Sequence, residues 1–455
     1  MISFWRGGLT LVVAVFVIQL CVVNSHAQSR STQIDELKRQ IEQIRNQNQQ
    51  QIEELRKKIE DIEAQKQADQ KTLEELAAEK EEEDKDAWWK KVDAGIKDGL
   101  FFKTKDGNFS MKFNLYGQVQ FSMNDTDDKD TATNFNIRRL RLIWSGNAFR
   151  PWLLYYAQLE ATDDIILRDA FFDVAYDTKF APRAGQYKPP FTREQLYSGT
   201  AHQLIERSIL DSEFGFGRDR GAGLYGALGN YIVYGAGVFN GDGRNGISAD
   251  SNLLYTGRVQ FTPCCGDLKY KQGQFPTGGD YNFEPNFGPN DKALIAISAA
   301  AAGIPGLNIE RKTPDGDLDD RFAEIGTVDA DVFSFTSDVN FRYSIFSLDA
   351  DYIFRRISLE ESGVSNVTDQ GFRVQSGLFV VPQFIEVAGR FAYIAYDDDV
   401  DGRDNKWEIT PGLNFYFYKN QKWKLQFAYS FIREEDVDGE ETDSNIFRTQ
   451  LQVYF

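Results

Sequence analysis

The last residues of the chain alternate between apolar and polar side chains and end on an aromatic residue. One parity holds Phe447, Leu451, Val453 and Phe455, and the other holds Arg448, Gln450 and Gln452. A period of two predicts a strand with one apolar and one polar face. The same alternation recurs along most of the chain, so its apolar faces together exceed what one packed core would cover. We therefore expect these faces to contact lipid.

Segments of this kind occupy most of the chain after residue 107. The predicted strands are 108–123, 134–148, 151–162, 166–177, 179–188, 217–228, 229–239, 252–263, 292–302, 330–344, 346–360, 369–381, 384–397, 406–418, 421–432 and 443–455. Closed bacterial barrels have an even number of strands, and closure leaves no backbone group unpaired in lipid. The predicted fold is an all-β transmembrane barrel of about 16 antiparallel strands over 108–455, preceded by an α-helical coiled coil.

The amino terminus has the composition of a secretory signal. Arg6 precedes an apolar run from Leu9 to Val23, and Ser25-His26-Ala27 supplies small residues at a cleavage site. The alternative is a membrane anchor, but the run is short. We predict a signal peptide over 1–27 and export to the outer membrane of a Gram-negative-type envelope.

Residues 28–91 are rich in Glu, Gln, Lys and Arg, with aliphatic residues at heptad spacing. The aliphatic positions are Ile34, Leu37, Ile41 and Ile44, and then Ile52, Leu55, Ile59 and Ile62. Isoleucine at both core positions favours three strands, so a periplasmic, trimeric coiled coil is predicted. A single solvated helix is the alternative, because polar residues interrupt the apolar seam. Residues 92–107 are expected to be a linker.

Several function classes are disfavoured by composition. The formal charge of −18 argues against a nucleic-acid partner, which needs a basic face. After cleavage His202 is the only histidine, so neither a Ser-His-Asp site nor a metal centre is expected. The adjacent Cys264 and Cys265 are expected to be loop residues. We predict that the protein is not an enzyme and has no cofactor.

Four segments resemble the phosphate-selective porin O and P family, in the order in which the family has them. They are 136–142 (NIRRLRL), 185–194 (GQYKPPFTRE), 205–208 (IERS) and 217–221 (GRDRG). The resemblance implies a homotrimeric outer-membrane channel surrounded by lipid and lipopolysaccharide. It also implies loops folded inward to a constriction, where arginines and lysines replace the water around a small anion.

The residues of the second predicted strand agree in part. Arg139 and Arg141 lie on the parity opposite Leu140 and Leu142, so they should point into the lumen, whereas Arg138 falls on the outward parity unless a bulge intervenes. Arg218 and Arg220 also share a face. Guanidinium groups pair with phosphate or carboxylate oxygens in two places at once. The alternative for each arginine is a structural pair with an acid of the barrel wall.

A long segment near 189–216 is the expected constriction loop. Pro189-Pro190 ends a strand because proline cannot donate to the ladder, and the following stretch is long enough to enter the lumen. We expect this loop to present Lys188, Arg193 and Arg207; an exposed loop is the alternative.

Other charged residues also fall on the lumen parity. The cations are Arg258, Arg342, Arg373 and Arg390, and the acids are Asp338, Asp349, Asp351 and Glu386. Inward cations favour anions, whereas the acids and the scarcity of lysine argue against strict phosphate selectivity. The predicted function is passive diffusion of small hydrophilic solutes through a porin that prefers anions, phosphate or similar oxyanions. A non-selective porin or a barrel-anchored tether or adhesin is the alternative.

Overall fold

A computed structural model describes residues 39, 42, 53–54, 56–75, 91–246, 252–263, 283–288, 290–308, 329–359, 366–397 and 403–455. The chain divides into two compact units, Met1–Trp88 and Trp89–Phe455. The expected signal peptide and the cysteine pair Cys264-Cys265 lie outside the described residues.

In the first unit, residues 56–75 are helical and exposed to solvent. Lys58 pairs with Glu54 at 3.2 Å, one turn earlier, as expected of a solvated helix. Ile59 and Ile62, two of the heptad positions, are exposed, so this single chain does not support the coiled coil expected over 28–91. No helix among the described residues is long and apolar enough to cross a membrane.

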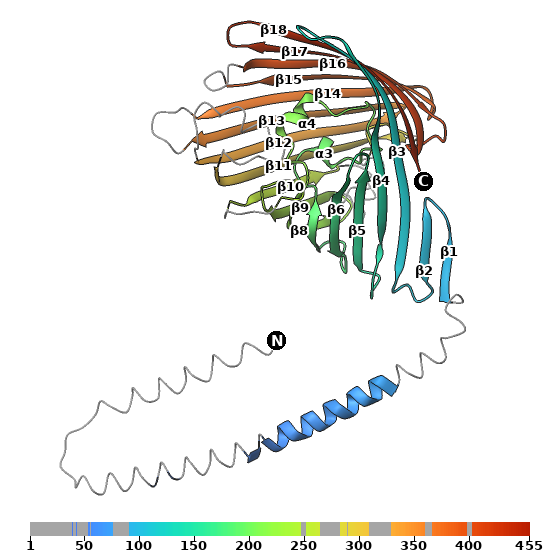
Figure 1. The fold of residues 1–455 in the computed structure, drawn as a ribbon, viewed down its shortest axis with the longest axis vertical. Coiled ribbons are helices and arrows are strands. Elements are labelled where there is room, and N and C mark those ends of the chain that lie inside the picture. Colours follow the sequence, from blue (N-terminus) through green and yellow to red (C-terminus); the bar gives the residue numbers. More distant parts are fainter. Residues whose placement is uncertain are drawn as a thin grey trace, which may run out of the picture. The chain divides into compact units, whose positions relative to one another are not determined.

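The second unit contains a closed antiparallel barrel of sixteen strands, β3 to β18 (Figure 1). The strands are β3 (Ser110–Thr126), β4 (Ala132–Asn147), β5 (Leu153–Ala161), β6 (Ile165–Val174), β7 (Ala181–Tyr187), β8 (Asp219–Leu228), β9 (Ile232–Phe239), β10 (Leu254–Phe261), β11 (Asn290–Asn308), β12 (Asp329–Ser344), β13 (Phe346–Leu359), β14 (Val367–Val381), β15 (Ile385–Ala395), β16 (Arg403–Tyr416), β17 (Trp423–Asp436) and β18 (Glu441–Tyr454). Each strand pairs with its neighbours in sequence. The barrel predicted from the alternating pattern is confirmed.

The terminal strand closes the barrel. β18 pairs with β3 in register from Ser444 opposite Thr126 to Tyr454 opposite Tyr116. Phe455 continues this seam, because its backbone exchanges hydrogen bonds of 2.8 and 3.0 Å with Leu115. Closure satisfies the backbone groups of both edge strands.

The segment expected to be a linker, 92–107, instead contains a β-hairpin. β1 (Val92–Ile96) pairs with β2 (Leu100–Thr104), and β2 continues the ladder onto β3. The turn needs positive φ at Asp98 (56°) and Gly99 (125°), and a side chain at Gly99 would meet the Phe113 carbonyl at 2.6 Å. Five-residue strands joined by such a turn are too short to show a clear period in the sequence.

The barrel wall separates apolar and polar side chains. On β12, Phe333, Phe335 and Val339 are exposed on the outer face, whereas Ser334 and Thr336 between them are buried in the interior. The outer surface is therefore an apolar belt, as expected of a lipid-facing barrel.

A long connection between β7 and β8 lies inside this wall (Figure 1). It contains two short helices, α3 (Arg193–Leu196) and α4 (Ile209–Phe214), which Thr192 and Ser208 cap. The apolar side chains of α4 pack against β13 and β15, where they meet Ile353 and Ile394. This connection, residues 188–218, is called the lumen loop below.

The outer belt generates a prediction. Phe335→Arg places a cation near the middle of β12 on the outer face and should lower the free energy of unfolding by about 2–4 kcal/mol. Urea titration of the protein folded into lipid vesicles measures this, with Phe335→Leu as the apolar control. Equal stability of the two variants would show that this face does not contact lipid.

Candidate functional site: the arginine-lined lumen

The lumen loop leaves two cavities inside the barrel. The loop-side cavity, about 920 Å³, lies where β3 ends and β4 begins, and includes Gln120 and Asn136. The turn-side cavity, about 480 Å³, lies where β3 begins and β18 ends, and includes Lys112 and Tyr454. Arg218 lines both cavities and therefore lies between them.

The loop-side cavity is strongly cationic. Its charged lining consists of Arg138, Arg139, Arg168, Arg207, Arg218, Arg244, Arg390 and Arg448, with Glu206, Asp211, Asp242 and Glu408. Eight guanidinium groups thus face four carboxylates. Arg168 and Arg218 pair with Glu160 and Asp169, which lie outside this lining. The other six guanidinium groups still outnumber the four carboxylates, and such an excess favours a positive potential.

A β-bulge brings Arg138 into the lumen beside Arg139. Gln118 of β3 opposes Arg139 and the next residue opposes Ile137, so Arg138 is the extra residue of β4. The Arg138 Nε donates to Glu206 of the lumen loop at 2.6 Å, and Arg139 lies 3.6 Å from the same carboxylate. The outward parity of Arg138 therefore does not hold, because the bulge reverses it.

Glu206 stays ionised between these arginines. Burial alone would raise the pKa of its carboxyl group, but Arg139 and Arg138 hold that pKa below its ordinary value. One carboxylate is shared by two guanidinium groups, so the group of three retains a positive charge.

Arg141, which lines the turn-side cavity, and Arg218, which lines both cavities, are each paired with an acid. Arg141 faces the turn-side cavity and donates to Glu160 at 2.7 Å, and Arg218 donates to Asp169 at 3.0 Å. Arg168 shares Glu160 with Arg141 at 3.4 Å.

Lys188 and Arg207 of the lumen loop line different cavities. Lys188 faces the turn-side cavity and donates to the Tyr197 carbonyl at 2.6 Å. Burial lowers the pKa of Lys188 well below its ordinary value, and Arg218 and Arg207 lower it further. Arg207 lines the loop-side cavity and pairs with Asp211 at 3.2 Å.

Arg193 lines neither cavity but anchors the lumen loop. It is buried, and its guanidinium donates to Asp338 at 2.5 Å, to Ser298 at 2.7 Å and to Gln260 at 3.0 Å on the barrel wall. A buried cation paired on three sides holds its segment in place rather than offering a site to a solute.

Arg220 also lies apart from both cavities. It donates to the Gly246 carbonyl at 3.1 Å, away from Arg218. The shared face predicted for Arg218 and Arg220 therefore does not bring both residues to the passage.

The other arginines on the lumen parity point inward and are paired with acids of the wall. The closest pairs are Arg258 with Asp338 (2.6 Å), Arg342 with Asp349 (2.9 Å), Arg373 with Asp351 (2.5 Å) and Arg390 with Glu408 (2.6 Å). Glu386, the remaining acid predicted on the lumen parity, accepts a hydrogen bond from the Tyr416 hydroxyl at 2.6 Å. These inward acids are thus already paired within the protein, and Asp338 and Asp349 also contact Arg193 and Tyr197 of the lumen loop.

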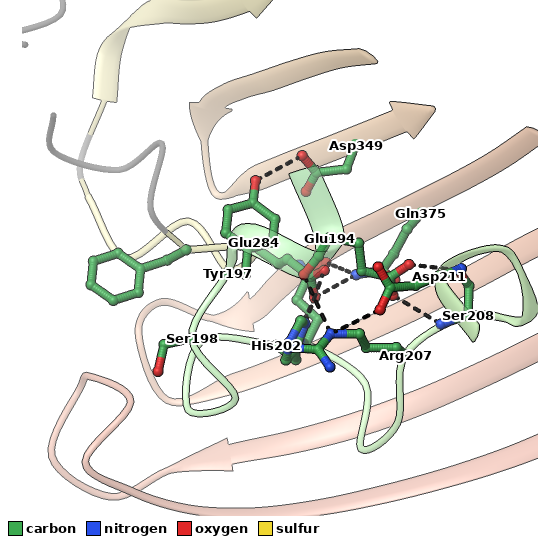
Figure 2. A network of polar contacts seen from close by, with 12 residues as sticks. Glu194, Tyr197, Ser198, His202, Arg207, Ser208, Asp211, Glu284, Asp349 and Gln375 are labelled. Atoms are coloured by element: carbon green, nitrogen blue, oxygen red, sulfur yellow. Dashed lines mark hydrogen bonds and ion pairs between the residues drawn. The ribbon is translucent and has the colours of Figure 1, made fainter. Parts of the chain in front are cut away.

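A second segment, residues 283–288, also enters the lumen. Glu284 is buried and accepts from the Gln203 backbone and from Gln375, each at 2.8 Å (Figure 2). Glu194 and His202 lie beside it, a grouping of the kind that binds metal ions. However, Arg373 lies 3.3 Å from Glu194 and 3.5 Å from Glu284, so a guanidinium already supplies the positive charge there. These contacts connect residues 283–288 to the lumen loop.

Sequence reasoning missed three of the cavity arginines, Arg168, Arg244 and Arg448. Arg168 is the extra residue of a second bulge, where Gln158 opposes Asp169 and Leu159 opposes Leu167. Arg448 lies on the polar parity of β18, a signal already visible in the sequence. Arg244 belongs to the connection after β9, where no strand alternation predicts which way a side chain points.

The sequence profile of the family described as phosphate-selective porin O and P matches residues 109–455, which include every strand of the closed barrel. The chain belongs to this family. An uncharacterized protein of Aquifex aeolicus is 23% identical over 304 residues, which are 63% of this porin and 67% of that protein.

Two solved structures share the fold of the porin. An anion-selective porin from Comamonas acidovorans gives a TM-score of 0.50 at 10% identity, covering 76% of this chain and 100% of that one. The trimer form of the outer-membrane protein OmpT of Vibrio cholerae gives 0.50 at 10% identity, covering 76% and 99%. The family match thus makes this protein a porin, and the two structures show that it shares their barrel fold.

The anchoring role of Arg193 can be tested. Arg193→Ala removes the contacts with Asp338, Ser298 and Gln260, so the lumen loop should detach and the single-channel conductance should rise and fluctuate. Breaking a buried pair in this way costs about 3–5 kcal/mol. Planar-bilayer recordings measure the conductance, with the exposed Arg150→Ala as control. An unchanged, quiet conductance would refute the anchoring role.

Proposed function

We propose that this porin is a passive channel that prefers small hydrophilic anions, with phosphate and similar oxyanions as its natural class. The observation that carries the proposal is the excess of arginine over carboxylate in the loop-side cavity. Such an excess raises the local concentration of anions and repels cations.

An anion would pass between successive guanidinium groups. Arg138 and Arg139 receive it in the loop-side cavity, Arg207 and Arg218 lie along the cavity wall, and Arg141 and Lys188 follow in the turn-side cavity. Planar guanidinium groups replace water around oxyanion oxygens. Each cation keeps a protein partner, so no single site holds the anion too tightly to leave.

The assembly is proposed to be a homotrimer in the lipid and lipopolysaccharide of the outer membrane. The trimer form of OmpT, which shares the barrel fold, supports three copies. The apolar belt supports the lipid contact. The helical region is proposed to lie in the periplasm.

The charge preference can be tested directly. Arg138→Ala combined with Arg139→Ala leaves Glu206 without guanidinium partners, so the anion-to-cation permeability ratio should fall severalfold. Reversal potentials across a planar bilayer in a potassium chloride gradient report this ratio. Arg220→Ala, which changes an arginine outside both cavities, serves as the matched control and should keep the original ratio.

Two outcomes would contradict the proposal. A reversal potential of the unmodified porin near zero would support the non-selective alternative. A preference for cations would exclude an anion channel altogether.

Acidification should strengthen the anion preference. Burial raises the pKa of Asp211 to about 6, against the opposing effect of Arg207, so this carboxylate of the loop-side cavity becomes neutral as the pH falls from 8 to 5. Loss of a negative charge makes the cavity more cationic. The permeability ratio should therefore rise over this range, and Asp211→Asn should show a smaller rise. A ratio that falls, or a variant identical to the parent, would be inconsistent with this role.

A further inference from the structure

The two cavities of the lumen differ in the kind of solute that their walls favour. The loop-side cavity has no aromatic side chain in its lining. The turn-side cavity is lined by Tyr116, Tyr156, Phe171, Tyr187, Tyr225, Phe283, Phe287 and Tyr454, together with Leu196 and Ile143. A hydrated inorganic ion gains nothing from such walls, whereas an apolar body loses unfavourable contact with water there.

The aromatic wall of the turn-side cavity is already ordered. Tyr156 stacks on Phe171 at 5.2 Å between ring centroids, and Phe171 meets Tyr187 edge to face at 5.8 Å. Phe287, from the second inward segment, is held against Tyr416 at 4.9 Å. The rings thus come from both the barrel wall and an inward segment, and their positions do not have to be organised by a ligand.

The same cavity contains amine groups that are not paired with a carboxylate among the described residues. Four of its cations, Arg141, Arg183, Arg218 and Lys422, pair with carboxylates. The structure records no ion pair for Lys112 or Lys188 among the residues it describes. Within the described part of the chain, Asp169 is the only carboxylate in the lining of this cavity.

The Tyr116 hydroxyl can donate a hydrogen bond to a solute in this cavity. The hydroxyl of Tyr116, a residue of which 1% is exposed, has no hydrogen-bond partner among the described residues. The Tyr116 ring lies under the Arg141 guanidinium at 5.7 Å, which places this donor beside a cation. A buried hydroxyl without a partner costs free energy that a bound acceptor would recover.

We propose that the turn-side cavity is a binding site for aromatic monocarboxylates, organic anions with a ring-shaped apolar body. This proposal rests on the proposed anion preference and narrows its substrate class. The carboxylate accepts hydrogen bonds from Lys188 and from the Tyr116 hydroxyl near Arg141. The ring lies against the aromatic lining of the cavity. A volume of about 480 Å³ is within the range of small-molecule sites.

The test uses the full porin in planar bilayers carrying a chloride current, with benzoate as the probe. Benzoate should reduce the chloride current at concentrations at least about tenfold lower than acetate, which has the charge without the ring. Benzyl alcohol, which has the ring without the charge, should leave the current unchanged. Calorimetric titration of the detergent-solubilised porin with the same three compounds measures binding without any current.

Variants locate the site. Tyr116→Phe keeps the ring and removes the hydroxyl, and Lys188→Met removes the amine at similar length. Each should raise the half-blocking concentration of benzoate about tenfold or more, because each removes a hydrogen bond to a charged group. Phe287→Leu should raise it as well, by removing a ring from the cavity. Arg220→Ala, outside both cavities, should leave it unchanged.

The outcomes separate this inference from the proposed function. If the reversal potential shows anion preference but benzoate and acetate block equally, the turn-side site is refuted and the anion channel stands. Benzoate block that survives both Tyr116→Phe and Lys188→Met also refutes the site. If the reversal potential shows cation preference, the proposed function itself fails.

Discussion

The pairing of guanidinium groups with carboxylates inside the barrel is the interaction on which the rest of the lumen depends. The lumen loop is buried with its charges, a costly state unless each charge finds a partner. Arg193 meets Asp338, and Glu194 meets Arg373. These pairs hold the loop across the passage and so divide the interior into two cavities with different linings.

The same pairing separates structural from functional cations. The inward arginines of β10 to β14 are paired with acids and contribute rigidity, with Arg258 and Asp338 as an example. Around Glu206 the match is incomplete, since Arg138 and Arg139 share one carboxylate. The proposed selectivity would therefore arise where carboxylates do not match the arginines, and the arginine count of the whole barrel is a poor guide to it.

The barrel strands could be predicted from sequence because alternation is a local property, and every predicted strand overlaps an observed one. The hairpin β1–β2 is too short to carry that signal. The pairing of Arg193 with Asp338 depends on two segments 145 residues apart, so no local pattern reveals which arginines anchor and which line a cavity. Likewise Arg138 and Arg168 face inward only because each is the extra residue of a β-bulge.

Those two bulges bear on how such a protein could change during evolution. A residue that is added to or removed from a strand shifts the register locally, and the side chain at that point moves from the hydrocarbon to the water without any change of residue type. Arg138 and Arg168 occupy such points on β4 and β6. Single-residue insertions and deletions at these points would therefore alter the ionic character of the channel while the membrane-facing surface on either side stays as it was.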